Sequence, residues 1–117
     1  MNNFMRNFLN QNKRNDFEIS SFEDHRISWN PAPTSPGDTV QISYRGLLKN
    51  SGADSVYLHY SFDSWNSPAN TIKMERDGDR FITEVKAQGN HELNFCFKDS
   101  AANWDNNNGT NWTMHLQ

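Results

Sequence analysis

The segment Val56-Tyr-Leu-His-Tyr-Ser-Phe62 carries the clearest structural signal in this chain of 117 residues. Every second residue of it is apolar or aromatic, which is typical of a β-strand with one buried face. The buried face would carry Val56, Leu58, Tyr60 and Phe62. Tyr57 and His59 must then point to the opposite, outer face of the sheet.

The same two-residue period continues on both sides of this segment. It recurs in Val40/Ile42/Tyr44, Phe81/Thr83/Val85, Leu93/Phe95/Phe97 and Trp112/Met114/Leu116, and more weakly in Ile27–Trp29 and Thr71–Met74. All four prolines lie between these runs, and Asp77-Gly78 is a turn signal. About seven short, half-apolar strands predict an all-β fold, an immunoglobulin-like antiparallel β-sandwich with no helix needed after residue 27.

The composition changes near residue 27. Residues 1–26 are rich in Asn and irregular, so we expect an N-terminal tail followed by one β-sandwich domain at residues 27–117. The pairs Phe4/Phe8 and Met5/Leu9 have i, i+4 spacing, which also allows a short amphipathic helix. The tail is therefore either a frayed end or an anchor for a partner or for a second copy of the chain.

Charge and cysteine content exclude several classes of function. The net charge of −3, with no concentrated basic block, argues against a nucleic-acid partner. No apolar run resembles a signal peptide or is long enough to cross a membrane. Cys96 is the single cysteine, so no internal disulfide or cysteine metal cluster forms, and a free thiol favours a cytoplasmic location. No cofactor and no metal site are expected.

Two tryptophans fall outside the alternating runs. Trp65 lies in the polar segment after Phe62, and Trp104 lies in the connection 99–110 between two patterned strands. Exposed aromatic residues on loops often mark recognition sites. An indole ring can lie flat on the C–H face of a pyranose, while His59 and asparagine amides can exchange hydrogen bonds with its hydroxyls. The candidate polar rim consists of Asn103, Asp105, Asn106 and Asn107.

Each of these residues also has a purely structural interpretation. Trp104 could plug the end of the sandwich, His59 could be a surface residue without a role, and the Asn-rich run could build turns. Asp105 alone is weak support for a cation site. Trp29 and Trp112 are in phase with apolar neighbours, so we assign both to the core.

These residues also carry a resemblance to a known family. His59-Tyr60 followed by Trp65, then Phe97-Lys-Asp99 and Asn103-Trp-Asp-Asn-Asn107, resemble carbohydrate-binding module family 25, the starch-binding modules, over residues 36–116. The resemblance implies a non-catalytic immunoglobulin-like β-sandwich in which one histidine and two tryptophans bind the ligand. Those positions correspond here to His59, Trp65 and Trp104.

An enzyme is the main competing class. A glycosidase needs two carboxylates across a substantial cleft, and turn roles account better for Asp63, Asp99 and Asp105. We therefore expect no catalytic residues. The sequence favours binding of an α-1,4-linked glucan such as starch or glycogen, and a homodimer through residues 1–26 would raise avidity. The alternative is a protein-interaction module that uses the same exposed aromatic residues.

Overall fold

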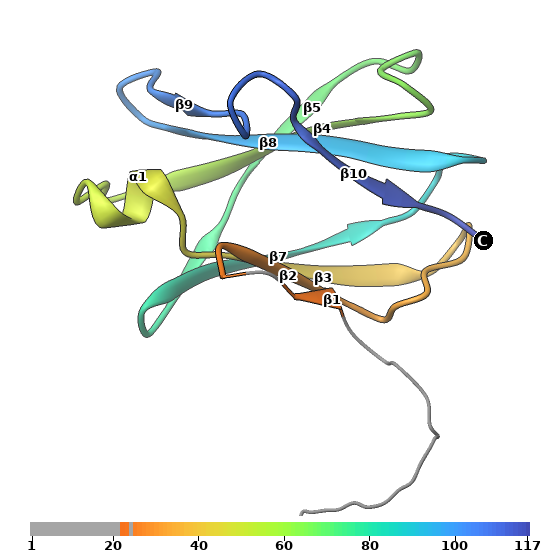
Figure 1. Cartoon of the computed structure of the whole chain (residues 1–117), viewed down its shortest axis with the longest axis horizontal. Helices are drawn as coiled ribbons and strands as arrows, with labels where there is room; N and C mark the ends of the chain where they lie inside the picture. The colour runs from red at the N-terminus through yellow and green to blue at the C-terminus, as the bar shows by residue number, and fades with distance from the viewer. Residues whose placement is uncertain (1–21, 24) are drawn as a thin grey trace, which may run out of the picture.

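The computed structural model describes residues 22–23 and 25–117 as two facing layers of antiparallel strands (Figure 1). The first sheet contains, in spatial order, β1 (Phe22–Glu23), β2 (Ile27–Asn30), β3 (Thr39–Tyr44), β7 (Arg80–Lys86) and β6 (Glu75–Asp77). The second contains β10 (Trp112–His115), β8 (Glu92–Asp99), β4 (Val56–Phe62) and β5 (Asn70–Lys73), with β9 (Trp104–Asp105) paired to β8. The predicted all-β antiparallel sandwich is confirmed.

The strands differ in detail from the sequence-based expectation. More than seven occur because two-residue and three-residue strands such as β1, β9 and β6 leave no readable alternation. β1 pairs with β2 and lies inside the segment 1–26 that we assigned to the tail. The pairs Phe4/Phe8 and Met5/Leu9, whose spacing allows a short helix or a frayed end, lie outside the described residues.

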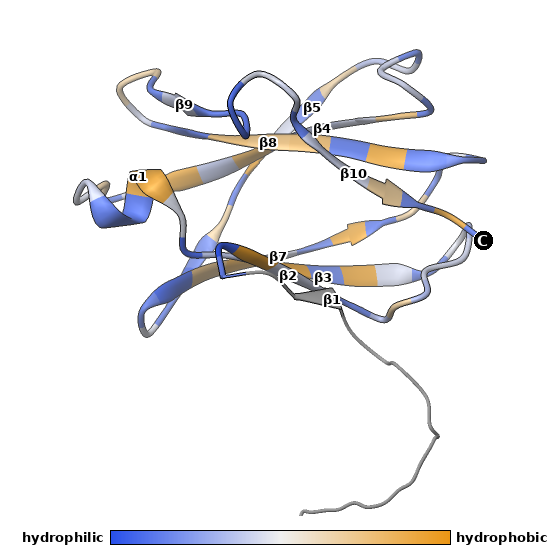
Figure 2. Ribbon diagram, in the orientation of Figure 1, coloured by the Kyte–Doolittle hydropathy of each residue, from blue (hydrophilic) through white to orange (hydrophobic). Residues whose placement is uncertain are grey.

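The core lies between the two sheets. The period-two pattern is visible in Figure 2, where hydrophobic and hydrophilic bands alternate along the strands. Phe95 is fully buried and contacts the rings of Trp29, Phe97 and Trp112. Trp29 and Trp112 therefore belong to the core, as predicted. Tyr60 is the exception on β4, since it is only partly buried while its neighbour Ser61 is buried and donates to the Ser67 carbonyl.

One short helix contradicts the expectation that none is needed after residue 27. α1 (Leu47–Asn50) follows β3 and closes one end of the sandwich beside β9 (Figure 1). Its Leu48 side chain is buried. A four-residue helix is too short to show a 3.6-residue period, and the helix exists here because tertiary contacts bind its first N–H groups. The Leu48 N–H donates to the Tyr44 hydroxyl at 3.0 Å.

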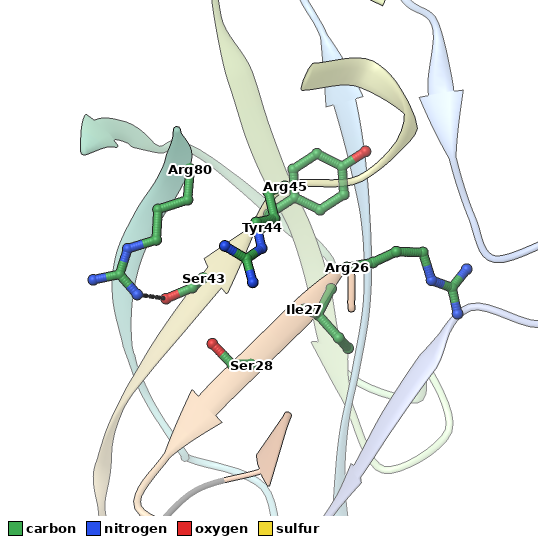
Figure 3. Close-up of a pocket in the computed structure, with 7 residues that line it drawn as sticks. All are labelled: Arg26, Ile27, Ser28, Ser43, Tyr44, Arg45 and Arg80. Carbon is green, nitrogen blue, oxygen red and sulfur yellow. Dashed lines mark hydrogen bonds between the residues drawn. The ribbon is translucent and has the colours of Figure 1, made fainter. Parts of the chain in front are cut away.

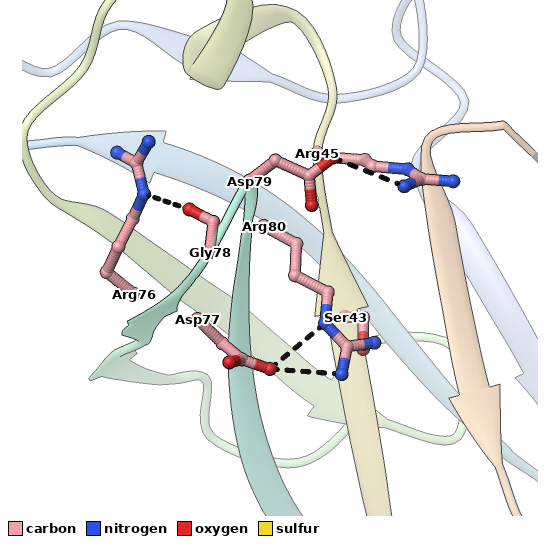
Figure 4. A network of polar contacts seen from close by, with 7 residues as sticks. All are labelled: Ser43, Arg45, Arg76, Asp77, Gly78, Asp79 and Arg80. Carbon is pink, nitrogen blue, oxygen red and sulfur yellow. Dashed lines mark hydrogen bonds and ion pairs between the residues drawn. The ribbon is translucent and has the colours of Figure 1, made fainter.

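The β6–β7 hairpin is tied to β3 by charged side chains (Figure 4). Gly78 occupies the turn with a φ of +65°, which confirms the predicted Asp77-Gly78 turn. The Arg80 guanidinium bonds Asp77 and also donates to the Ser43 hydroxyl. Arg45 forms an ion pair with Asp79 at 3.6 Å.

Candidate functional site

Three aromatic side chains, which we call the platform, meet on the outer face of the second sheet: His59, Trp65 and Trp104. The ring centroids of His59 and Trp65 are 5.8 Å apart with planes at 25°. Those of His59 and Trp104 are 5.3 Å apart with planes at 83°. The two indole planes therefore differ by at least 58°, the difference between these two angles. The structure brings together the three residues that the sequence singled out.

His59 sits in the middle of β4, between its neighbouring strands β5 and β8. Its cross-strand partners are Thr71 on β5 and Cys96 on β8, and paired residues point to the same face. The Thr71 hydroxyl lies 2.7 Å from His59 Nδ1. Because Nδ1 is engaged, Nε2 is the ring nitrogen that can meet a ligand. Cys96 is buried on the His59 side, and this burial raises the pKa of its thiol to about 11.

Trp65 is presented by a turn with unusual backbone geometry. Asp63, Ser64 and Trp65 are consecutive left-handed residues, with φ of 54°, 61° and 63°. Such angles are costly for residues other than glycine, so surrounding contacts must hold them. Oδ1 of the buried Asn94 on β8 accepts the N–H of Ser64 at 2.8 Å and that of Trp65 at 3.3 Å.

The Asp63 carboxylate holds the same turn through hydrogen bonds to the start of β8. Asp63 accepts the backbone N–H groups of Asn90, His91 and Glu92 at 2.7 to 3.1 Å. These three bonds lower the pKa of Asp63 below its ordinary value. Together, Asn94 and Asp63 hold the backbone of this turn and so position the Trp65 indole.

Trp104 lies on β9 and is one of two large exposed hydrophobic residues within the described chain, with 45% of its surface accessible. It pairs with Lys98 on β8, whose ammonium nitrogen lies 5.9 Å from the Trp104 ring centroid. The other exposed residue is Leu47 on α1, at 60%. Trp104 does not plug the end of the sandwich, and its ring is open to a ligand.

Asp105 points away from the platform and into the protein. Its carboxylate accepts the Tyr44 hydroxyl at 2.6 Å and the Leu47 N–H at 3.3 Å. Burial, followed by the bond to Asp105, raises the pKa of Tyr44 above its ordinary value. Gly46 makes this approach feasible, since a Cβ there would lie 2.7 Å from the Tyr44 ring and 2.9 Å from the Asp105 carboxylate. Asp105 thus anchors β9 to α1 and β3.

The asparagines of the expected rim are largely engaged with the chain itself. Asn103 Nδ2 donates to Asp99 at 2.9 Å, and Asn106 Oδ1 accepts the Gly109 N–H at 2.9 Å. Asn107 accepts from Arg26 and donates to the Asn111 carbonyl. The run therefore builds turns, and Asn103 and Asn106 remain exposed beside Trp104.

Of the residues that support the platform, sequence reasoning singled out only Asp63, to which it gave a turn role. Thr71 pairs with His59, and Lys98 pairs with Trp104. These pairings depend on the register between strands, which the sequence of a single strand does not reveal. The N–H groups that Asp63 and Asn94 bind are not marked by any sequence pattern.

A hollow of about 220 Å³ lies on the outer face of the first sheet and contains none of the predicted site residues. Figure 3 shows Arg26, Arg45 and Arg80 around it. The Arg26 guanidinium donates to Asn107 at 3.0 Å. Asp77 and Asp79 neutralise Arg80 and Arg45. We assign this hollow no role.

Two further properties of the described residues bear on function. Residues 22–23 and 25–117 contain no group of three or more His, Cys, Asp or Glu side chains arranged to hold a metal ion. No helix within this part of the chain is long and apolar enough to span a membrane.

Comparison with known proteins gives two matches. Residues 40–95 match the model of a starch/carbohydrate-binding module, family 53, a segment that includes His59 and Trp65 and ends before Trp104. Over 93 residues the chain is 31% identical to an alpha-amylase of Clostridium acetobutylicum. The alignment covers 78% of this chain and 12% of the amylase. No solved structure matches the chain.

These matches support a starch-binding carbohydrate-binding module and do not point to family 25 in particular. The matches thus support the broader part of the resemblance, to starch-binding modules, and not its assignment to family 25. The immunoglobulin-like connectivity of the sandwich stays a prediction.

Proposed function

We propose that this chain is a non-catalytic module that binds α-1,4-linked glucan on the platform of His59, Trp65 and Trp104. The observation that carries the proposal is the convergence of these three rings on one face, outside a core that needs none of them. The family 53 match and the amylase relative support the same class of ligand.

The tilt between the indoles favours a curved ligand. Successive glucose units of an α-1,4 chain turn relative to one another, whereas those of a β-1,4 chain form a flat ribbon. Two indole planes inclined to each other by at least 58° match the turning α-1,4 chain. A flat β-1,4 ribbon would stack on only one of the two rings. Each indole would contribute apolar contact to a pyranose face with little loss of side-chain entropy.

Hydroxyl contacts would come from His59 Nε2 and from the exposed amides of Asn103 and Asn106. The His59 ring contacts both indoles, so it can reach hydroxyls of two neighbouring glucose units. Asn107 would act by holding the turn, and Asp105 by anchoring β9 below Trp104.

A single open platform should bind weakly, because it leaves much of the ligand in water and orders a flexible chain. We extend the proposal to a glycogen-type or amylopectin-type storage polymer inside the cell and to a homodimer through residues 1–26, which would raise avidity. Light scattering that shows a monomer at high concentration would exclude the dimer.

Isothermal titration with maltoheptaose and cellohexaose tests the function. We expect saturable binding of maltoheptaose only, and a loss of about tenfold or more in both Trp65→Ala and Trp104→Ala, because stacking aromatic residues dominate such interfaces. Leu47→Ala is the control, since Leu47 is the other large exposed hydrophobic residue of the described chain and lies on α1.

The outcomes are distinct. Loss in Trp104→Ala alone would remove Trp65 from the site and keep the function. Absence of heat with both sugars from the folded protein would reject glucan binding and favour a protein-interaction module.

A further inference from the structure

A row of alternating lysine and aromatic side chains lies beside the platform. Strand register pairs Tyr57 with Lys73 on β5 and with Lys98 on β8, and Lys98 with Trp104 on β9. Directly paired residues point to the same face, so Lys73, Tyr57, Lys98 and Trp104 form one line across four strands, which we call the lysine row.

The lysine row runs next to the row that contains His59. Tyr57 and His59 are two residues apart on β4 and share the outer face, which places them about 7 Å apart along the strand. Trp104 belongs to both groups, because its ring also contacts that of His59. A glucan stacked on Trp104 would therefore have Lys98 at its side.

Lys98 is held in place by ring faces. Its ammonium nitrogen lies 4.9 Å from the Tyr57 ring centroid and 5.9 Å from that of Trp104. It donates to the Asp99 carbonyl at 3.1 Å. Within the described residues, no carboxylate forms an ion pair with Lys98 or Lys73.

The carboxylate nearest in sequence is engaged elsewhere. Asp99 accepts the N–H groups of Ala101 and Asn103 and the Asn103 amide. It follows Lys98 on β8, so strand alternation turns it towards the other face. Asp99 is close enough to Lys98 for the two charges to interact, and Glu75 lies near Lys73, but neither carboxylate forms an ion pair with these lysines. The lysine row therefore keeps ammonium groups that a ligand anion can reach.

We propose that the lysine row selects α-glucans that carry phosphate monoester groups. A phosphate monoester has a charge of about −1.5 to −2 at neutral pH and several acceptor oxygens. A lysine ammonium binds such a group as a point charge, and it gains less from neutral hydroxyls. The stacked glucose units occupy the platform, and a phosphate on a unit beside Trp104 meets Lys98 and, farther along, Lys73. This inference rests on the proposed function and deepens it.

The test compares maltoheptaose with phosphorylated maltoheptaose by isothermal titration at low and at moderate salt. We expect the wild-type chain to bind the phosphorylated ligand about two- to tenfold more tightly at low salt, and this preference to shrink as salt screens the charges. Lys98→Gln should abolish most of the preference, Lys73→Gln part of it, and Lys98→Arg should retain it. Lys86→Gln, on β7 of the opposite sheet, is the matched control and should change nothing.

The affinity of the same variants for neutral maltoheptaose tests whether Lys98 has only a structural role. If Lys98 only supports the Trp104 ring, Lys98→Gln will weaken both ligands equally, and that result overturns the inference. Equal affinity of the wild-type chain for both ligands overturns it as well, with the proposed function intact. Absence of binding to either ligand overturns the proposed function and this inference together.

Discussion

At the scale of single residues, His59 depends on its neighbours for both its orientation and its chemistry. The hydroxyl of Thr71, 2.7 Å from Nδ1, holds the ring, while the indole of Trp65 lies almost parallel to it. The hydrogen bond engages Nδ1, so Nε2 is the ring nitrogen left to meet a ligand. Thr71 is thus a positioning residue.

Replacement of Thr71 by Val tests this role. We expect affinity for maltoheptaose to fall about two- to tenfold, since one hydrogen bond that orients His59 is lost. The melting temperature should change little, because Thr71 is exposed. Titration and thermal unfolding measure the two effects.

Thr39→Val is the matched control, because Thr39 is an exposed threonine on the first sheet. Unchanged affinity in Thr71→Val would show that the platform orients His59 without this hydroxyl.

At the scale of elements, the two indoles are supported in different ways. Trp104 lies on a two-residue strand whose next residue, Asp105, is bonded to Tyr44 inside the sandwich. Trp65 lies on a left-handed turn whose N–H groups bind Asn94. The Asp63 carboxylate of the same turn binds three N–H groups at the start of β8, those of residues 90–92. The second support contains a carboxylate, Asp63, whose pKa is lowered by these bonds, so it depends on pH.

The lowered pKa of Asp63 gives the sign of this dependence. The folded state favours the carboxylate, so its contribution to stability is complete above the ordinary aspartate pKa of 3.8. The contribution is lost as pH falls from that value through the lower pKa of the folded state. We therefore expect wild type to be more stable than Asp63→Asn at neutral pH and the difference to vanish at the lowest pH.

Urea denaturation between pH 2 and pH 7 measures this difference. Asp38→Asn is a useful control, because Asp38 also accepts a backbone N–H, at Ser35, but lies away from the platform. A stability difference that stays constant down to the lowest pH would contradict the assignment.

At the scale of the whole molecule, the sandwich is held by a small number of large side chains. Phe95 is fully buried at the centre of the aromatic core, with Trp29, Phe97 and Trp112 around it. A core of this size leaves a net stability of about 5–15 kcal/mol. The rigid support below the platform therefore depends on a few aromatic contacts.

Phe95→Ala should remove about 3–5 kcal/mol of the free energy of unfolding, through lost burial and the cavity left behind. Urea denaturation followed by circular dichroism measures the change. Leu47→Ala is the control and should stay within about 0.5 kcal/mol of wild type, since Leu47 is 60% exposed. Comparable losses in both variants would contradict this description of the core.

The sequence by itself determined the layered fold and the three residues of the platform. Period-two alternation records which side chains face the core, so it identified Trp29, Trp112 and Phe95 as core residues. The same alternation left His59 on the outer face, and the polar segments around Trp65 and Trp104 separated both indoles from the core.

Only the tertiary structure decided how these residues are held together. Strand register places Thr71 and Lys98 beside the platform, and register depends on partners far away in the sequence. Asp105 was expected on the polar rim, yet a buried carboxylate is stable here because Tyr44 and α1 supply its hydrogen bonds. Contacts of this kind join segments that no local pattern connects, so they exist only once the chain is folded.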